Sequence, residues 1–331
     1  MQAIVLEGFG GPEVMVMGRA PLPEPGRGQV RVRVVATSVN RADTVQRRGN
    51  YPPPAGESEI LGLEVAGVVD ATGTGVDQWR PGDRVMGLVA GGGYAEYALA
   101  YAGHLMAIPE ALSFEEAACV PEVYITAFLN LFLIGGLSAG QTVLLHGGGG
   151  GVNTAGIQMC RLLVPDARIL VTASSAKIDR VRQLGADAVI DYRQMDFAQE
   201  VRALTDGRGA DLILDHIGAQ YLAKNQASLA VGGRLVVIGL MGGAAAELNL
   251  GLLLVKRQQI LGSVLRALPV ARKSEITAAF VERVLPRITQ RAIVPLIHKV
   301  YPLSDAAHAH QEMEQSRHFG KIVLAVDQGS P

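Results

Sequence analysis

Short runs in which apolar and polar residues alternate occupy the first third of the chain. They are Gln29–Val35, Val65–Asp70, Asp83–Leu88 and Tyr94–Ala100. Alternation with a period of two is typical of strands with one buried face. Turn signals such as Pro25-Gly26 and Pro81-Gly82-Asp83 separate the runs. The pattern predicts an antiparallel, barrel-like β domain.

The pattern changes near residue 113, where Ser113 and Glu116 have the spacing of a capping box. A helix is expected around Ile125–Leu133. Continuous apolar runs then alternate with helical periods such as Thr154–Leu163 and Lys177–Leu184. The expected strands are Thr142–His146, Ile169–Thr172, Ala188–Asp191, Leu212–Asp215, Leu235–Gly239 and Gln259–Val264. This alternation predicts a parallel, doubly wound α/β sheet.

The last sixty residues do not continue that alternation. A long amphipathic helix is expected at Ser274–Leu285, and an apolar run follows at Ile322–Val326. We therefore expect the tail to return to the first domain.

Length and composition bound the class of protein. A chain of 331 residues with 49% hydrophobic and 18% charged residues fits about two globular domains. The formal net charge of -1 provides no basic field for a nucleic-acid backbone.

Two cysteines, Cys119 and Cys160, exclude a disulfide framework and favour a reducing compartment. The first residues lack a signal-peptide pattern. No stretch is expected to be long and apolar enough to span a membrane, and the nearest one, 141–160, is interrupted by glycines. We expect a soluble, cytoplasmic protein.

Five glycines, Gly147–Gly151, join the strand Thr142–His146 to a helix. A strand, a glycine turn and a helix N-terminus form the phosphate cradle of dinucleotide-binding folds. The usual third glycine is missing, because Asn153 stands at that position, so we expect a slightly displaced helix. The alternative is a flexible turn without a ligand, although five glycines cost roughly 0.5–1 kcal/mol each within regular structure.

The end of the second predicted strand selects the cofactor. An NAD site usually has an acid there for the ribose 2′-hydroxyl, and residues 172–177 contain none. Ser174, Ser175 and Lys177 offer two hydroxyls and an ammonium to a 2′-phosphate, and Tyr192 adds a further contact. This predicts NADPH. The alternative is that Ser175 caps a helix and Lys177 is solvated.

Several short motifs, in order and spacing, resemble the zinc-independent quinone oxidoreductases of the medium-chain dehydrogenase/reductase superfamily. Within it, the apoptosis-associated subgroup matches over essentially the whole chain. The motifs are Asn40-Arg-Ala-Asp43, Tyr51-Pro-Pro-Pro54, Leu61-Gly-Leu-Glu64, Gly91-Gly-Gly-Tyr-Ala-Glu-Tyr97, Thr126-Ala127-Phe128, Gly239-Leu-Met-Gly-Gly243 and Gly320-Lys-Ile-Val323.

The resemblance implies a Rossmann domain at 123–265 and a GroES-like substrate domain at 1–122 and 266–331. It also implies a homodimer joined through edge strands of the Rossmann domain, with Ala244–Val264 as the candidate segment. The leucine run Leu248–Leu254 within that segment is equally consistent with internal core.

The resemblance also implies residues that contact NADPH. It places Asn40 and Thr126 at the nicotinamide. The other implied cofactor contacts are Gly150, Gly151 and Val152 at the pyrophosphate, Ser174, Lys177 and Tyr192 at the adenosine phosphate, Gly239, Leu240, Met241, Leu265 and Arg266 around the nicotinamide ribose and ring, and His318 from the tail.

No metal is expected. Related zinc dehydrogenases carry Cys, His and Cys or an acid at the catalytic metal, where this chain has Asn40, Leu63 and Glu122. Asn40 and Leu63 cannot replace a thiolate and an imidazole. Two cysteines are also too few for a structural zinc lobe.

The histidines give no metal motif either. Positions two apart on a helix do not share a face, so His308 and His310 are interpreted as surface histidines. His146 and His216 follow strands at the edge where a cofactor would bind, and a cofactor-side role stays open for both. His298 is isolated.

Without a Lewis acid, the favoured acceptors are those that stabilise their own negative charge, such as quinones and conjugated enones. Tyr51 is the candidate donor to the developing oxyanion, with Tyr124 and Asn40 as secondary catalytic candidates. The alternative for Tyr51 is packing in a proline-rich turn.

Two other functions stay open. One is reduction of activated C=C bonds in 2-alkenals or enoyl thioesters. A thioester carrier would need a basic anchor, and the one candidate group, Arg41, Arg47 and Arg48, is better interpreted as a solvated face. The other is a crystallin or RNA-binding role, against which the net charge and 5% aromatic content speak.

Overall fold

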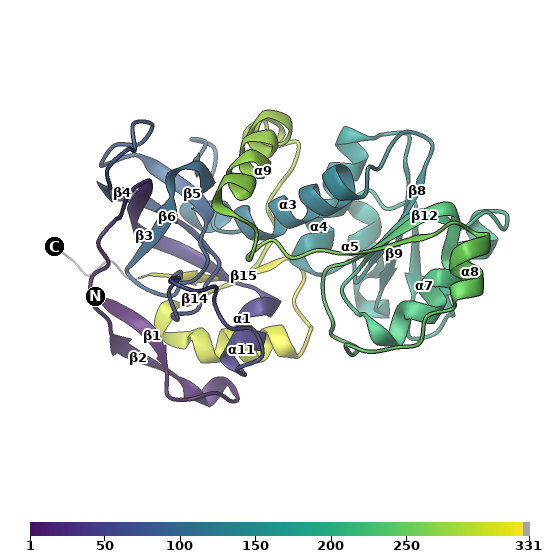
Figure 1. Ribbon diagram of the computed structural model, residues 1–331, viewed down its shortest axis with the longest axis horizontal. Helices are drawn as coiled ribbons and strands as arrows, with labels where there is room; N and C mark the ends of the chain where they lie inside the picture. Colours follow the sequence, from purple (N-terminus) through teal and green to yellow (C-terminus); the bar gives the residue numbers. More distant parts are fainter. Residues whose placement is uncertain (327–331) are drawn as a thin grey trace. The chain divides into compact units, whose positions relative to one another are not determined.

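The computed structural model describes residues 1–326 and divides into two compact units. The first consists of Met1–Ile125 together with the chain from Leu265 onward, and the second is Thr126–Val264. The bounds expected from the sequence, 122/123 and 265/266, lie three residues and one residue from these. Figure 1 shows the second unit as one continuous stretch of chain, in teal and green.

The second unit is built on a six-stranded sheet in which every neighbouring pair is parallel. Its strands are β8 (Thr142–His146), β9 (Arg168–Ala173), β10 (Ala188–Asp191), β11 (Ala210–Asp215), β12 (Leu229–Val237) and β13 (Gln259–Gly262). The order is β10-β9-β8-β11-β12-β13, so the direction of winding reverses between β8 and β11. The predicted doubly wound sheet is confirmed. Ligands of such sheets bind at the carboxyl ends of the strands at this reversal.

Helices connect these strands. They are α4 (Gly151–Leu163), α5 (Ile178–Gln183), α6 (Phe197–Leu204), α7 (Leu222–Ser228) and α8 (Leu250–Val255). The start of α6 shows how the sequence sets a boundary. The Asp196 carboxylate accepts from the N–H of Ala198 at 2.9 Å, and Phe197 and Val201 then face the core.

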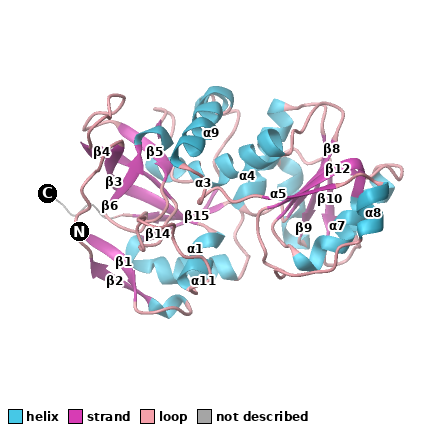
Figure 2. Cartoon of the chain, viewed as in Figure 1, coloured by secondary structure: helices cyan, strands magenta, loops and turns pink. Residues whose placement is uncertain are grey.

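The first unit contains a mainly antiparallel sheet in the order β14-β15-β3-β4-β5-β7, with β6 also paired to β3. Its strands are β3 (Gln29–Val39), β4 (Glu64–Thr72), β5 (Arg84–Leu88), β6 (Tyr97–Tyr101), β7 (Leu105–Ala107), β14 (Ile297–Pro302) and β15 (Lys321–Ala325), and a separate pair is formed by β1 (Gln2–Leu6) and β2 (Met15–Arg19). Strand β15 lies antiparallel to β3, so the predicted return of the tail is confirmed (Figures 1 and 2).

The helices of the first unit are α1 (Arg41–Arg47), α2 (Phe114–Ala117), α9 (Val270–Arg283), α10 (Leu285–Thr289) and α11 (Ala306–Glu314). The predicted capping box is present: the Glu116 N–H donates to Ser113 Oγ at 3.2 Å, and the Ser113 N–H donates to Glu116 Oε2 at 3.1 Å.

Helix α3 (Pro121–Phe128) continues as a π-helix over Leu129–Ile134. The run Phe114–Ile134 is long and apolar enough to cross a membrane by length and composition. The sequence-based statement that no run meets that test was therefore wrong. Because 78% of its most apolar window is buried, the apolar character of this run is that of a core helix.

Candidate functional site

The glycine turn of the second unit is shaped by crowding at each step. Gly147 has φ +76°, a conformation that side chains rarely adopt. A Cβ on Gly148 would lie 2.4 Å from Val171 Cγ1, and one on Gly149 would lie 2.5 Å from Lys177 Cδ. Helix α4 begins at Gly151, and the first N–H groups of a helix have no partner within it. The turn therefore presents bare backbone and a helix N-terminus, which fits a dinucleotide phosphate.

Asn153, at the position of the missing third glycine, is buried and closes this turn. Its Nδ2 donates to the carbonyl oxygens of His146 and Gly147, the second at 3.2 Å. The side chain thereby satisfies two main-chain acceptors at the end of β8. Where the usual motif has a glycine, Asn153 therefore adds two hydrogen bonds within the turn.

His146, the last residue of β8, is enclosed behind the turn. Its Nε2 lies 2.7 Å from Asn225 Oδ1, its Nδ1 lies 3.1 Å from Thr172 Oγ1, and the rings of Phe197 and Tyr221 pack on it. Burial lowers the pKa of His146 to about 3, although the bond to Asn225 raises it. His146 is a neutral scaffold residue, and its ring is not presented to a cofactor.

Lys177 reaches across the glycine turn, with Nζ 3.1 Å from the position of a Cβ on Gly149. Ser174, at the N-cap position of the short helix Ser175–Lys177, is half-buried and makes no side-chain capping bond. Ser175 instead donates to Asp191 and accepts from Gln194 Nε2 at 3.3 Å. Of the two predicted hydroxyls, Ser175 is thus engaged within the protein.

Tyr192 is 39% exposed beside the guanidinium of Arg193, whose central carbon lies 5.9 Å from the ring centre. Sequence reasoning did not include Arg193. The signal that would have found it is its place directly after Tyr192, past the end of β10. Arg193 is an exposed cation at this edge of the sheet, in addition to the half-buried Lys177.

The loop after β12 is joined to the loop after β11. The Ile238 N–H donates to Asp215 O at 2.7 Å, and the Met241 N–H donates to His216 O at 3.1 Å. Leu240 and Met241 are 56% and 50% exposed. Their main chain is therefore fixed while both apolar side chains remain available for a ligand.

In the first unit, Asn40 is the centre of a buried polar cluster. Its Nδ2 donates to Glu64 Oε1 at 2.8 Å, and its Oδ1 accepts from Lys321 Nζ at 2.6 Å. Lys321 also forms an ion pair of 3.0 Å with Glu64, and both side chains are almost fully buried. Leu63, which precedes Glu64 in the sequence, is also buried. Lys321 is the cation of this buried cluster.

Glu122 lies against this cluster, because its N–H donates to Glu64 Oε2 at 2.8 Å. The pKa of Glu122 is raised to about 8, first by burial and then by the charge of Glu64, against the opposing charge of Lys321. Glu122 binds its proton more tightly than a free glutamate.

A chain of hydrogen bonds extends from this cluster through the first unit. Arg47 Nη1 donates to His310 Nδ1 at 3.1 Å, so the ring proton is on Nε2, which lies 3.0 Å from Tyr94 Oη. Tyr94 donates to Asp43 Oδ2 at 3.2 Å, and the same oxygen accepts from the Asn40 N–H at 2.7 Å.

This chain corrects two expectations. His310 was expected at the surface and Arg47 on a solvated face, but both are fully buried. Their bonds join α1 and α11, and Arg47 also pairs with Glu314. Arg48 is exposed, and so is His308, as predicted.

Tyr51 is held by Arg266 within the first unit. Arg266 Nη1 donates to Tyr51 O at 3.3 Å, and the guanidinium carbon lies 5.1 Å from the ring centre. Arg266 also donates to Ala90 O at 2.8 and 2.6 Å. Burial, followed by the charge of Glu122, raises the pKa of the Tyr51 hydroxyl. The structure thus gives the predicted cofactor contact Arg266 a role in fixing Tyr51.

The remaining predicted residues are placed as follows. Tyr124 donates to Val294 O at 3.2 Å, which occupies its hydroxyl proton. His318 is buried with its ring centre 6.4 Å from that of His298, and Leu265 is buried as well. Thr126 is half-buried in the second unit, and its carbonyl oxygen accepts from Asn130 Nδ2.

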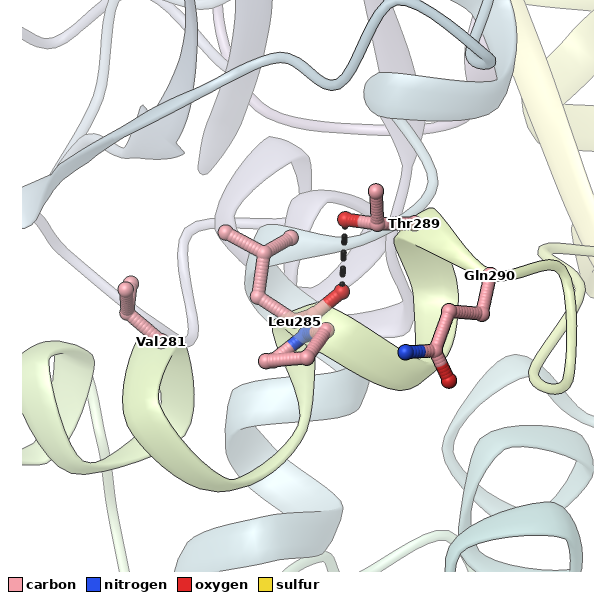
Figure 3. Close-up of a pocket in the computed structure, with 5 residues that line it drawn as sticks. Val281, Leu285, Thr289 and Gln290 are labelled. Atoms are coloured by element: carbon pink, nitrogen blue, oxygen red, sulfur yellow. Dashed lines mark hydrogen bonds between the residues drawn. The ribbon is translucent and has the colours of Figure 1, made fainter.

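Within residues 1–326, no three His, Cys, Asp or Glu side chains form a group that could hold a metal ion. A shallow hollow of about 360 Å³ lies on α9 and α10, between Val281, Leu285, Thr289 and Gln290 (Figure 3). Thr289 donates to Leu285 O at 3.0 Å there. This hollow lacks ionisable side chains and includes none of the predicted site residues.

The second unit is a parallel sheet with a glycine turn at its reversal, and the first unit is built from the N-terminal and C-terminal segments of the chain. This arrangement is that of a two-domain, nucleotide-dependent oxidoreductase. Two family models match: the alcohol dehydrogenase GroES-like domain at residues 26–110 and the zinc-binding dehydrogenase at residues 184–324. The chain belongs to the medium-chain dehydrogenase/reductase superfamily, with a Rossmann-like unit and a GroES-like unit, as the sequence predicted.

Individual relatives are similar along nearly the whole chain. Quinone oxidoreductase of Sus scrofa is 33% identical, over 98% of this chain and 97% of its own. The human synaptic vesicle membrane protein VAT-1 homolog is also 33% identical, over 98% of this chain and 86% of its own. These similarities are consistent with the apoptosis-associated quinone reductase subgroup.

Two solved structures bear on the chemistry. Escherichia coli quinone oxidoreductase complexed with NADPH matches with a TM-score of 0.89 at 27% identity, over 98% of this chain and 100% of its own. The JamJ enoyl reductase matches with a TM-score of 0.88 at 25% identity, over 98% and 99%. Both quinone and enoyl reductases are thus among the similar proteins.

Proposed function

We propose that this protein transfers a hydride from NADPH to a quinone, without a metal. The observation that carries the proposal is the end of β9, where Lys177 reaches across the glycine turn, Ser174 follows the strand, and residues 172–177 include no acid. An ammonium suits a 2′-phosphate, whereas NAD sites rely on a carboxylate. Similarity to quinone oxidoreductases supports the choice of acceptor.

The cluster at Asn40 supports metal-free chemistry. The oxygen of the Asn40 side chain already accepts from Lys321, and the Lys321 ammonium is paired with Glu64. A divalent cation at this place would stand beside a buried positive charge, which is unfavourable. Asn40 and Leu63 also lack the thiolate and imidazole that zinc sites use.

NADPH supplies the hydride when bound, and the chain's own groups orient the acceptor and stabilise its charge. Tyr51 donates a hydrogen bond to the oxyanion that develops as the quinone accepts the hydride. Arg266 stacks on the Tyr51 ring and bonds its main chain, which holds the phenol in one orientation. Asn40 is a secondary candidate. Tyr124 is weaker, because its proton is given to Val294.

The second candidate function is reduction of activated C=C bonds, as in 2-alkenals. The specific observation is the similarity to an enoyl reductase along the whole chain. A thioester carrier would need a basic anchor. Of the three arginines considered for it, Arg47 is buried and paired with Glu314, so it is not available for that role.

We also propose a cytoplasmic homodimer without a nucleic-acid partner. The edge strand β13 follows α8 in the chain, and the α8 side chains Leu250, Leu254 and Val255 are each more than 60% exposed. An exposed apolar patch beside an unpaired strand edge is typical of an interface. This favours pairing over internal core for the leucine run.

The test follows NADPH oxidation by absorbance with a panel of ortho-quinones, para-quinones and 2-alkenals, with NADH as the parallel donor. Turnover of quinones with NADPH preferred is the expected result. Lys177→Ala is expected to reduce the preference for NADPH over NADH by about tenfold, the scale of one charge-assisted hydrogen bond. Arg182→Ala, which removes an exposed cation paired with Asp179, is the matched control. Preference for alkenals would select the second candidate.

A further inference from the structure

Two buried cations of the first unit, Arg266 and Lys273, are joined to each other through the main chain. Arg266 precedes α9, Lys273 belongs to its first turn, and each residue is 6% exposed. Lys273 Nζ donates to Arg266 O at 3.1 Å. Arg266 donates to Ala90 O, at 2.8 and 2.6 Å, and to Tyr51 O at 3.3 Å. Both cations are therefore held by carbonyl groups, which carry no full charge.

The lack of an ion pair distinguishes these two cations from the other buried ones. Among residues 1–326, four lysine or arginine residues are buried. Two of them, Arg47 and Lys321, form ion pairs with glutamates. In the same described part of the chain, no carboxylate forms an ion pair with Arg266 or Lys273. Because buried charges are normally paired, this place lacks the counter-charge that the fold provides elsewhere.

The acids that act on the two cations do not neutralise them. Burial lowers the pKa of both cations, and the negative charges that Glu57 and Glu122 can carry oppose that shift. Glu122 holds a proton at neutral pH, because its pKa is raised to about 8. The Asp43 carboxylate, which also acts on Arg266, accepts hydrogen bonds from the Tyr94 hydroxyl and two main-chain N–H groups. Positive charge is therefore in excess here.

This excess acts at Tyr51, the proposed hydrogen-bond donor to the acceptor. The guanidinium carbon of Arg266 lies 5.1 Å from the centre of the Tyr51 ring. Burial, followed by the charge of Glu122, raises the pKa of the Tyr51 hydroxyl, and the charge of Arg266 opposes that increase. Charges inside a protein are screened less than in water. A negative group bound beside this phenol is therefore favoured over a neutral one.

We infer that the acceptor site at Tyr51 selects quinones that bear an anionic substituent, such as a carboxylate or sulfonate, and that Lys273 determines this specificity. The inference rests on the proposed function, because it names the class of acceptor for that same site. The anionic substituent serves recognition only, and the hydride goes to the quinone ring system as it does in a neutral acceptor. The substituent supplies the counter-charge that Arg266 and Lys273 lack.

The test compares two acceptors that differ in charge alone, a para-naphthoquinone with a carboxyethyl side chain and the methyl ester of the same compound. NADPH oxidation is followed by absorbance at pH 7. The natural chain is expected to have a kcat/KM about tenfold higher for the acid than for the ester, the scale of one charge-assisted hydrogen bond. Comparing this ratio between variants cancels any difference in intrinsic reactivity between the two compounds.

Two variants remove the charge of Lys273. Lys273→Met removes the ammonium and its hydrogen bond, whereas Lys273→Gln replaces the ammonium with a neutral donor. Both are expected to lower the acid-to-ester ratio about tenfold, because the charge sets the preference. Arg272→Met, which removes an exposed cation of the same helix that pairs with Glu275, is the matched control and keeps the ratio of the natural chain. A urea midpoint for each variant verifies that it is folded.

The outcomes separate the inference from the proposed function. Equal kcat/KM values for the acid and the ester in the natural chain would overturn the inference and leave quinone reduction intact, and this comparison requires no variant. A preference that persists in folded Lys273 variants would also overturn it. If the natural chain oxidised NADPH with neither compound nor with any other quinone, the proposed function would fall, and the inference with it.

Discussion

Lys321 Nζ donates to Asn40 Oδ1 at 2.6 Å, across 281 positions of sequence. The bond joins the start of β15 to the residue before α1, and the ion pair of Lys321 with Glu64 lies beside it. A catalytic candidate of the N-terminal segment is therefore oriented by a side chain of the C-terminal segment. That dependence makes the stability of the first unit sensitive to one buried charge.

Replacing Lys321 by methionine leaves Glu64 buried without its cation. Loss of one partner of a buried pair costs about 3–5 kcal/mol of unfolding free energy. We expect Lys321→Met to show that loss in urea denaturation, and Lys321→Met with Glu64→Gln to recover part of it. Equal loss in the single and double variants would show that the charge of Glu64 is not the cause.

The buried, neutral His310 predicts that the folded chain loses stability in mild acid. Burial lowers the pKa of His310 from 6.5 to about 3. The unfolded chain therefore binds a proton between pH 6.5 and pH 3 that the folded chain does not, so the unfolding free energy decreases as the pH falls through that window. His310→Gln is expected to be less stable at pH 7 and to show a shallower decline on acidification. His308→Gln, on the exposed side of α11, serves as the control in urea melts at each pH.

The raised pKa of Glu122 predicts that the folded chain loses stability as the pH increases. Its pKa is raised from 4.5 to about 8, so the folded chain holds a proton that the unfolded chain loses above pH 4.5. The unfolding free energy contributed by this group therefore decreases as the pH increases from 4.5 to 8. Glu122→Gln removes the group, and we expect a higher melting temperature than that of the natural chain at pH 8, with a smaller difference at pH 5. An equal difference at both pH values would contradict the shift.

The tight contact at Gly147 can be separated from its backbone conformation. Gly147 and Gly140 both have φ +76°, but a Cβ on Gly140 meets no atom within 4 Å, whereas one on Gly147 meets His216. Gly140→Ala is expected to cost about 1–2 kcal/mol, the backbone penalty alone. Gly147→Ala should cost more, and His216→Ala added to it should recover the excess. Urea midpoints of the four proteins measure both contributions.

Local patterns predicted the second unit closely. Strands β8 and β10 have the bounds that the apolar runs indicated, and the Ser113 capping box formed as its spacing implied. Strand β12 begins at Leu229, six residues before the predicted start at Leu235, and continues through Gly232-Gly233. Pairing with neighbouring strands can extend a strand past such glycines.

Long-range packing was the part that the sequence could not show. The helical period correctly separates His308 from His310, which lie on different faces. It does not say that α1 would cover the face with His310, because the Arg47–His310 bond spans 263 residues. Lys321 and Glu122 likewise acquire their roles from partners far along the chain. The candidate residues were identifiable from motifs, but the charges that surround them were not.

Strand β15 lies between β14 and β3, so the central sheet of the first unit is closed by a segment that follows the entire second unit in the chain. During synthesis, the second unit is a continuous stretch and has all its strands before Lys321 leaves the ribosome. Asn40 and Glu64 can bind the ammonium of Lys321 only after that residue has left the ribosome. The order of assembly is therefore imposed by connectivity: the Rossmann-like unit can fold early, and the GroES-like unit is completed last.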